Sequence, residues 1–269
     1  MDIANLLTME SGLILLIGLV TGVLGGMLGV GGSVIMIPAL TLLLGYNQHL
    51  YQAAAMLANV AVSIPAALRH RKAGAMVNDA IKWMLPAALV FVMVGVTVSN
   101  LAIFQGEDGA KWLGRVLAGF LLYVIWVNVR RLACKTVEPP ADHAHLSAQR
   151  CGLVGTAMGS VAGLMGIGGG AIAVPLQQVV LRLPLRSCIA NSSAIICITA
   201  SIGCVYKIGT LGMHGLLPGQ AIQTGLMLAP TAWLGGRIGA SLTHRLPIRQ
   251  VRMAFIILMI VATWKMAAL

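Results

Sequence analysis

The chain has 269 residues, of which 58% are apolar and only 9% are charged, and its formal net charge at pH 7 is +11. A soluble domain carries about 25% charged residues, so this composition excludes the soluble classes and indicates an integral membrane protein. The positive charge does not indicate a nucleic-acid binder, because Lys and Arg lie in short loops between apolar runs, as orientation signals do.

The apolar runs are continuous rather than alternating, which predicts an all-α membrane protein. The first residues lack a basic start and a cleavage site, so no removable signal peptide is expected. In chain order we expect a first repeat over 1–135, with a broken helix over 11–44 and spans over 52–68, 83–104 and 112–130. A cytoplasmic linker over 136–150 precedes a second repeat over 151–269, with a broken helix over 151–181 and spans over 187–206, 216–242 and 248–264.

The strongest motif is a glycine-rich phrase that occurs once in each half. Its members in the first half are Gly29, Gly31, Gly32 and Pro38, and these recur at an offset of 137 as Gly166, Gly168, Gly169 and Pro175. Glycine costs about 1 kcal/mol relative to alanine in a helix, so two dense clusters at matching places predict helices that break there. In a membrane protein such paired breaks indicate a binding site near the midplane.

The length of the first segment in each half limits how it crosses the membrane. Residues 11–44 would form a straight helix of about 50 Å, which exceeds a hydrocarbon core of about 30 Å. Two half-helices that enter and leave on one side would fit, and so would one full span followed by a short piece that does not cross. The charges of the loops favour the re-entrant arrangement. Of the 17 Lys and Arg residues that lie outside the spans, this arrangement places 13 on the inner side of the membrane.

The expected fold is therefore an internal inverted repeat. Each half contains a broken, re-entrant, glycine-rich helix and three transmembrane helices, and both termini lie outside.

Three parts of the sequence together resemble the sulfite exporter TauE/SafE family. They are Gly29-x-Gly31-Gly32-Ser33 with Pro38, the repeat Gly166-x-Gly168-Gly169-Gly170 with Pro175, and the ending Gly235-Gly236-Arg237-Ile238-Gly239-Ala240. The resemblance covers about residues 10–265. It implies a multi-pass permease of the bacterial inner membrane that carries sulfite, sulfoacetate, taurine-derived or related organosulfur anions. It implies transport more firmly than it implies any one solute.

The charged residues also favour an anion as the substrate. All seven carboxylates lie in termini or loops, so no acid within a span is expected to bind a cation or relay protons. Half-helices that begin near Ser33, the expected N-cap, and Gly170 would present unpaired N–H groups and positive dipole ends to an anion.

We expect the substrate to meet Gly29, Gly31, Gly32, Ser33, Asn59, Gly166, Gly168, Gly169, Gly170, Asn191 and Ser192. Further candidates for the pathway are Arg237, Ser63 and Thr199, and neither a cofactor nor a metal is expected.

Each of these residues also has a purely structural interpretation. Small residues let membrane helices approach closely, and Gly18, Gly22 and Gly26 are expected to do only that. The polar side chains within spans could hydrogen-bond neighbouring helices, and Arg237 could snorkel to the interface. The histidines lie in loops or at helix ends and are expected to be solvated, although His49 and His70 could act at a gate.

These observations predict a secondary transporter, expected to export small sulfur-containing anions such as sulfite, sulfoacetate or related organosulfonates. The alternative is an uptake permease for sulfate, thiosulfate or an organosulfonate. The spans carry no nucleophile–base or metal constellation, which disfavours an intramembrane enzyme. A scaffold protein would not explain glycine clusters at matching positions in both halves. The expected partners are a small anionic solute and the lipid bilayer, and the oligomeric state stays open.

Overall fold

The computed structural model describes residues 9–45, 47–101 and 146–267, together with positions 119, 122, 123, 125, 126, 129, 130 and 132. The described part of the chain is helical and contains no strand, which confirms the all-α class. Residues 1–8, most of the expected span 112–130 and most of the linker 136–150 lie outside the described residues.

The described residues form the following helices. They are α1 (Met9–Leu28), α2 (Ser33–Leu44), α3 (Gln48–Lys72), α4 (Asn78–Ser99), α6 (Ala148–Met165), α7 (Gly170–Leu176), η4 (Gln177–Leu181), α8 (Leu185–Thr210), η5 (Leu211–His214), α9 (Pro218–Arg245) and α10 (Ile248–Ala267). Residues 102–145, between α4 and α6, lie almost entirely outside the described part. Within the described residues, four segments are long and apolar enough to cross a membrane by length and composition: Ser11–Leu28, Gln48–Lys72, Asn78–Ser99 and Leu185–His214.

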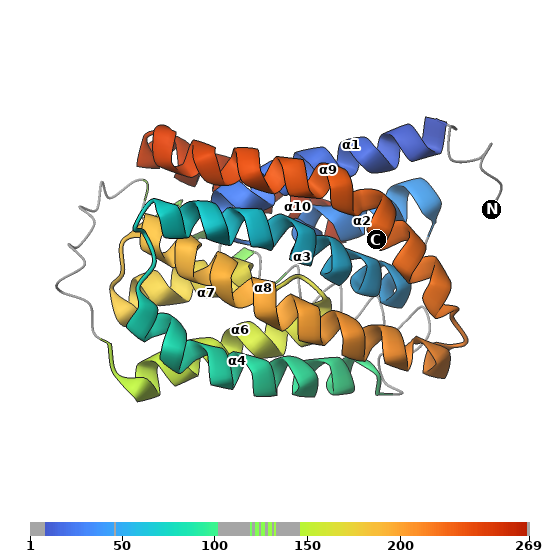
Figure 1. Cartoon of the computed structure of the whole chain (residues 1–269), viewed down its shortest axis with the longest axis horizontal. Helices are drawn as coiled ribbons and strands as arrows, with labels where there is room; N and C mark the ends of the chain where they lie inside the picture. Colours follow the sequence, from blue (N-terminus) through green and yellow to red (C-terminus); the bar gives the residue numbers. More distant parts are fainter. Residues whose placement is uncertain are drawn as a thin grey trace.

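The glycine phrases separate two helices that run back along each other. In Figure 1, α1 starts at the right-hand end of the bundle, and α2 returns to that end before α3 begins. The α6 helix starts at the opposite end, and α7 with η4 returns there before α8 begins. Each glycine-rich segment therefore enters and leaves at one end of the bundle, and the two segments use opposite ends.

The second helix of each phrase has the expected extent. The α2 helix covers residues 33–44, and the apolar helical segment made by α7 and η4 covers residues 170–181. The last five residues of the second of these segments, η4, form a π-helix, which has wider i→i+5 turns. The expectation that Ser33 is the N-cap is wrong: Gly32 occupies that position, and Ser33 is the first helical residue. Gly31 and Gly168 adopt φ values of 79° and 70°, a left-handed conformation that favours glycine.

The first helix of each half packs on a helix of the other half, and the two contacts match. A Cβ atom on Gly22 of α1 would lie 2.9 Å from the Cα of Ala232 in α9. A Cβ atom on Gly159 of α6 would lie 2.9 Å from the Cα of Ala88 in α4. Gly22 and Gly159 are related by the offset of the glycine phrases, and Ala88 and Ala232 are related by a slightly longer offset of 144. The same close approach to α9 occurs at Gly18 and Gly26, which confirms their expected packing role.

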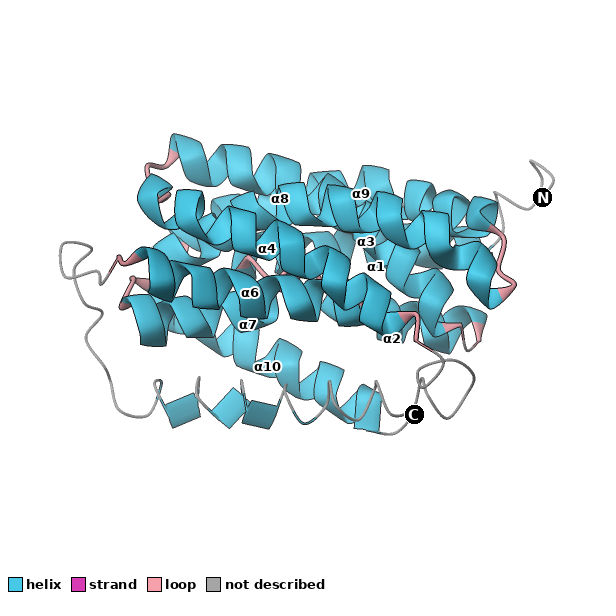
Figure 2. Ribbon diagram, turned by 90° about the horizontal axis from the view of Figure 1, so that it is seen from below, coloured by secondary structure: helices cyan, strands magenta, loops and turns pink. Residues whose placement is uncertain are grey.

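Because α1 packs on α9 and α6 packs on α4, each contact joins the two halves into one bundle. Figure 2 shows α4 and α6 lying side by side along the bundle, with α3, α8 and α9 behind them. The α3 and α8 helices have the same place in their respective halves and run in opposite directions through the centre. They are the most buried of the four candidate spans, with 72% and 67% of their most apolar windows inside the bundle. The two glycine breaks lie against these central helices.

Candidate functional site

The two glycine turns meet each other inside the bundle. Residues 29–33 and 166–170 are all buried. A Cβ atom on Gly170 would collide with the carbonyl oxygen of Gly29 and lie 2.6 Å from the Cα of Val30. Because these neighbours are backbone atoms that cannot swing aside, no side chain fits at Gly170. The sequence-predicted residues of the two phrases are thus brought together at one place.

The amide of Asn59 lies between the two turns. Asn59 is fully buried in α3, and its Nδ2 donates to the Oγ of Ser33 at 2.8 Å. Its Oδ1 accepts from the backbone N–H of Ser33 at 3.2 Å. A Cβ atom on Gly31 would lie 3.0 Å from Oδ1, and one on Gly168 would lie 3.1 Å from Nδ2. One polar side chain therefore contacts both turns and satisfies the first N–H of α2.

The contacts of the turns with α3 and α8 are reciprocal between the halves. A Cβ atom on Gly29 would lie 2.8 Å from the Cα of Ile189 in α8, and one on Gly166 would lie 2.8 Å from the Cβ of Gln52 in α3. Both pairs obey the offset of the glycine phrases, since Gly29 corresponds to Gly166 and Gln52 to Ile189. Asn59 corresponds to the apolar Ile196, so the centre of the site is polar on one side only.

Asn191 and Ser192 make their hydrogen bonds away from this centre. The Nδ2 of Asn191 donates to the Oε1 of Gln177 at 3.1 Å, and its Oδ1 accepts from the N–H of Val77 at 2.9 Å. The Nε2 of Gln177 donates to the Oγ of Ser192 at 2.9 Å and to the carbonyl of Cys188 at 3.3 Å. This network fixes the π-helical turn to α8. The sequence analysis did not single out Gln177. The feature that could have identified it is the pair of glutamines, Gln177 and Gln178, within an otherwise apolar half-helix.

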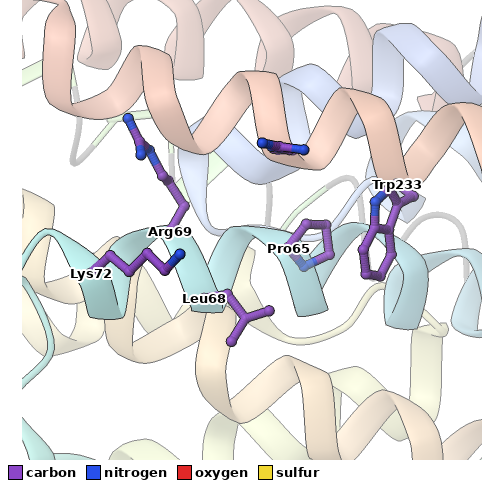
Figure 3. Close-up of a pocket in the computed structure, with 6 residues that line it drawn as sticks. Pro65, Leu68, Arg69, Lys72 and Trp233 are labelled. Atoms are coloured by element: carbon purple, nitrogen blue, oxygen red, sulfur yellow. The ribbon is translucent and has the colours of Figure 1, made fainter.

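The other expected pathway residues lie apart from the turns. Ser63 and Thr199 each donate to a carbonyl of their own helix, at 3.3 Å and 3.0 Å, which is the structural alternative weighed for them. Arg237 lines a surface pocket of about 210 Å³, together with Pro65, Leu68, Arg69, Lys72 and Trp233 (Figure 3).

A buried lysine lies near one end of the bundle. Lys207 is fully buried near the end of α8, and its Nζ lies 3.0 Å from the Nδ1 of His49, 2.9 Å from the Oγ of Ser99 and 3.0 Å from the Oδ1 of Asn100. An ammonium group has three N–H donors, and these contacts use all of them. The ring of His214 stacks on that of His49 at 4.0 Å between centroids, and its Nε2 lies 3.0 Å from Asn100 Oδ1. We call these five residues the Lys207 cluster.

A pair of histidines lies near the opposite end of the bundle. His70 is fully buried near the end of α3, and its Nδ1 lies 2.9 Å from the Nε2 of His244. Its Nε2 lies 3.4 Å from the carbonyl oxygen of Gly26. Arg186, at the start of the central helix α8, lies at this end and repels a positive charge on His244. The Nε of Arg186 is buried with no hydrogen-bond partner, while its Nη2 donates to the carbonyl of Leu246. We call His70, His244 and Arg186 the His70 cluster.

The two clusters occupy matching positions in the two halves. The offset of the glycine phrases relates His70 to Lys207 and His49 to Arg186, and the longer offset of 144 relates Asn100 to His244. The expectation that the histidines are solvated is wrong for His70, which has no exposed surface, and for His49, which is 9% exposed. Lys207, which follows directly after the expected span 187–206, is also buried, and α8 continues past it to Thr210.

Among the residues that the structure describes, no group of three or more His, Cys, Asp or Glu side chains could hold a metal ion. The polar groups at the turns are backbone amides, one carboxamide and one hydroxyl. Hydrogen-bond donors of this kind are suited to an oxyanion.

Comparison with known proteins identifies relatives over nearly the whole chain. The family model described as "Sulfite exporter TauE/SafE" matches residues 14–266. The probable membrane transporter protein MamO of Magnetospirillum gryphiswaldense is 30% identical over 266 residues, which cover 88% of this chain and 42% of the relative. The probable membrane transporter protein YunE of Bacillus subtilis is 24% identical over 274 residues, covering 92% of this chain and 94% of the relative.

The two kinds of relative differ in length. The chain spans about two fifths of the MamO proteins it matches, including that of Paramagnetospirillum magneticum, of which 41% is covered. It spans nearly all of the probable membrane transporter protein of Haemophilus influenzae, to which it is 24% identical with 97% of the relative covered. No solved structure matches the chain.

Proposed function

Because this chain belongs to the sulfite exporter TauE/SafE family of membrane transporters, we propose that it is a secondary carrier of small sulfur-containing anions. The substrates proposed are sulfite, sulfoacetate and related organosulfonates, moved outward across the bacterial inner membrane. The observation that carries the proposal is the buried meeting of the two glycine turns around Asn59.

The chemistry at the turns suits an oxyanion. Helix N-termini present free N–H groups and a positive dipole end, and these groups bind sulfate-like anions without a lysine. Ser33 and Asn59 add a hydroxyl and an amide that now bond each other, and both can turn their donors toward a bound anion. Within the described helices that face the centre, α3 and α8, there is no carboxylate to repel an anion.

The two polar clusters fit the ends of a transport path. His70 lies eleven residues beyond Asn59 in α3, and Lys207 lies eleven residues beyond Ile196 in α8. At 1.5 Å per residue each cluster is about 16 Å from the level of the turns, in opposite directions. We propose that they close the path at its two ends and that one of them opens at a time, as alternating access requires.

The distribution of charge gives the proposed orientation. The His70 end carries the basic last turn of α3, with Arg69, Arg71 and Lys72, and the end of α9, with Arg245. By the positive-inside rule this end faces the cytoplasm, and both termini lie outside. An inside-negative potential is worth about 2.3 kcal/mol per charge per 100 mV and drives an anion outward, which favours export.

Counterflow in proteoliposomes tests this proposal. Vesicles that contain the purified chain are loaded with unlabelled sulfite, sulfoacetate, taurine or sulfate and diluted into a trace of the labelled compound. The proposal expects transient accumulation of label with sulfite or an organosulfonate inside, and none in protein-free vesicles. Exchange of sulfate alone would support the alternative of an uptake permease, and exchange of none of these solutes would remove the substrate class.

A further inference from the structure

The surface pocket between α3 and α9 is lined by three positively charged side chains. Its volume is about 210 Å³, and it lies between the last two turns of α3 and the C-terminal half of α9, toward the His70 end of the bundle. Arg69 and Lys72 come from the last turn of α3, and Arg237 comes from α9 eight residues before its end. Within the part of the chain that the structure describes, no carboxylate lines the pocket or forms an ion pair with these three cations.

The rest of the pocket wall is apolar and faces outward. Figure 3 shows Pro65 and Trp233 on the side of the pocket away from Arg69 and Lys72, with Leu68 between Lys72 and Pro65. Leu68 is 53% exposed and Trp233 is 41% exposed. On α9 the neighbouring Leu234 and Ile238 are exposed as well. In a membrane protein this apolar surface faces acyl chains, and a tryptophan beside cations marks the interface with the headgroups.

We propose that this pocket binds the phosphate headgroup of an anionic phospholipid, such as phosphatidylglycerol. Arg69, Lys72 and Arg237 contact the phosphodiester, while Leu68, Pro65 and Trp233 contact the upper part of an acyl chain. Cationic pockets between transmembrane helices are suited to such headgroups, because guanidinium groups donate paired hydrogen bonds to phosphate oxygens.

The three cations of the pocket have no charged counterparts at the equivalent positions of the repeat. The offset of the glycine phrases relates Arg69 to Tyr206 and Lys72 to Gly209, and the offset of 144 relates Arg237 to Met93. The tyrosine bonds Thr97 on the protein surface instead. A solute that crosses the bundle meets both ends, whereas a lipid of one leaflet meets only one. The one-sided pocket therefore fits a lipid better than it fits the transported anion.

Lipid retention measured by native mass spectrometry tests the proposal on the full chain. The purified protein is equilibrated in detergent with phosphatidylglycerol or with zwitterionic phosphatidylcholine, and bound lipid is counted. The wild type is expected to retain phosphatidylglycerol selectively. Removing one cation by Arg237→Gln should weaken that retention about fivefold, and the triple variant R69Q/K72Q/R237Q should abolish the selectivity.

The matched control is Arg71→Gln, which removes one exposed positive charge from the last turn of α3, beside Arg69 and Lys72 but outside the pocket. Equal retention of the two lipids by the wild type, or an equal loss in R71Q and R237Q, would overturn the proposal. Displacement of phosphatidylglycerol by millimolar sulfate or inorganic phosphate would also overturn it, in favour of a site for free anions. Counterflow is measured separately, so a wild type that retains the lipid but exchanges no solute would refute the proposed transport and leave the lipid site standing.

Discussion

His70 and Lys207 hold equivalent positions in the two halves, and each is fully buried at the far end of a central helix. One pairs with a histidine and the other with three neutral acceptors, at opposite ends of the bundle. His70 and Lys207 share a position and are both buried although their side chains differ. This points to a similar role for the two residues at the two ends of the bundle. The glycine turns lie midway between them along the two central helices.

Replacement of Lys207 by methionine tests the first cluster. The change removes the Nζ donor that His49, Ser99 and Asn100 share, and a lost hydrogen bond to a charged group costs about 1.5–3 kcal/mol. We expect K207M to lower the apparent melting temperature in detergent and to slow counterflow at least tenfold. The control is Lys82→Met at an exposed lysine of α4, which should change neither. Identical behaviour of K207M and K82M would refute the role assigned to this cluster.

Replacement of Asn59 by aspartate tests the polar centre. Aspartate keeps the shape of the side chain and can still accept from the N–H and hydroxyl of Ser33, but it adds a negative charge beside both turns. We expect N59D to insert and fold, yet to lose anion exchange, because the charge repels the substrate. Asn78→Asp, the same change at the exposed start of α4, should exchange normally. Normal exchange by N59D would mean that the anion does not pass this residue.

Alanine at Gly22 and Gly159 tests the packing between the halves. Each new methyl group would press on backbone atoms of the partner helix, with Ala232 and Ala88 at 2.9 Å. Overpacking of this kind costs about 1–3 kcal/mol. Gly152→Ala is the control, because nothing lies within 4 Å of its Cβ position in α6, and alanine should there stabilise the helix by up to about 1 kcal/mol. In thermal unfolding, G22A and G159A should therefore lower the apparent melting temperature, and G152A should raise it. Shifts of the same sign in all three variants would contradict the packing described.

The sequence was sufficient to predict the breaks and the helical class. Consecutive glycines at 29–32 and 166–170 are incompatible with continuous helices, so the starts of the following helices near 33 and 170 could be derived from local physics alone. Asn59 was predictable for a similar reason, since a carboxamide inside an apolar run needs a partner. These features depend on residues close together in the chain.

The partners of these residues could not be derived in the same way. The four-residue spacing of Gly18, Gly22 and Gly26 indicates a close-packing face, but it does not reveal that the facing helix is α9 of the other half. The expected span 187–206 stops just before Lys207, the first charge after the apolar run. In the folded chain three acceptors from distant segments satisfy that charge, and α8 continues past it.

Valine at Gly168 and at Gly170 tests the site most closely. At Gly170 the side chain would displace the backbone of Gly29 and Val30, and at Gly168 it would press on the amide of Asn59 and force a left-handed conformation. We expect both variants to insert into the membrane and to lose transport. Gly209→Val, in α8 with nothing within 4 Å of its Cβ position, is the control.

The most direct test of an anion carrier built on the glycine turns is the current that accompanies sulfite or sulfoacetate flux, recorded from proteoliposomes on a solid-supported membrane. The wild type and G209V should show a current whose sign is that of moving negative charge, and G168V and G170V should show none at equal protein density. An undiminished current in both turn variants, or no current and no exchange in the wild type with either anion, would contradict the account.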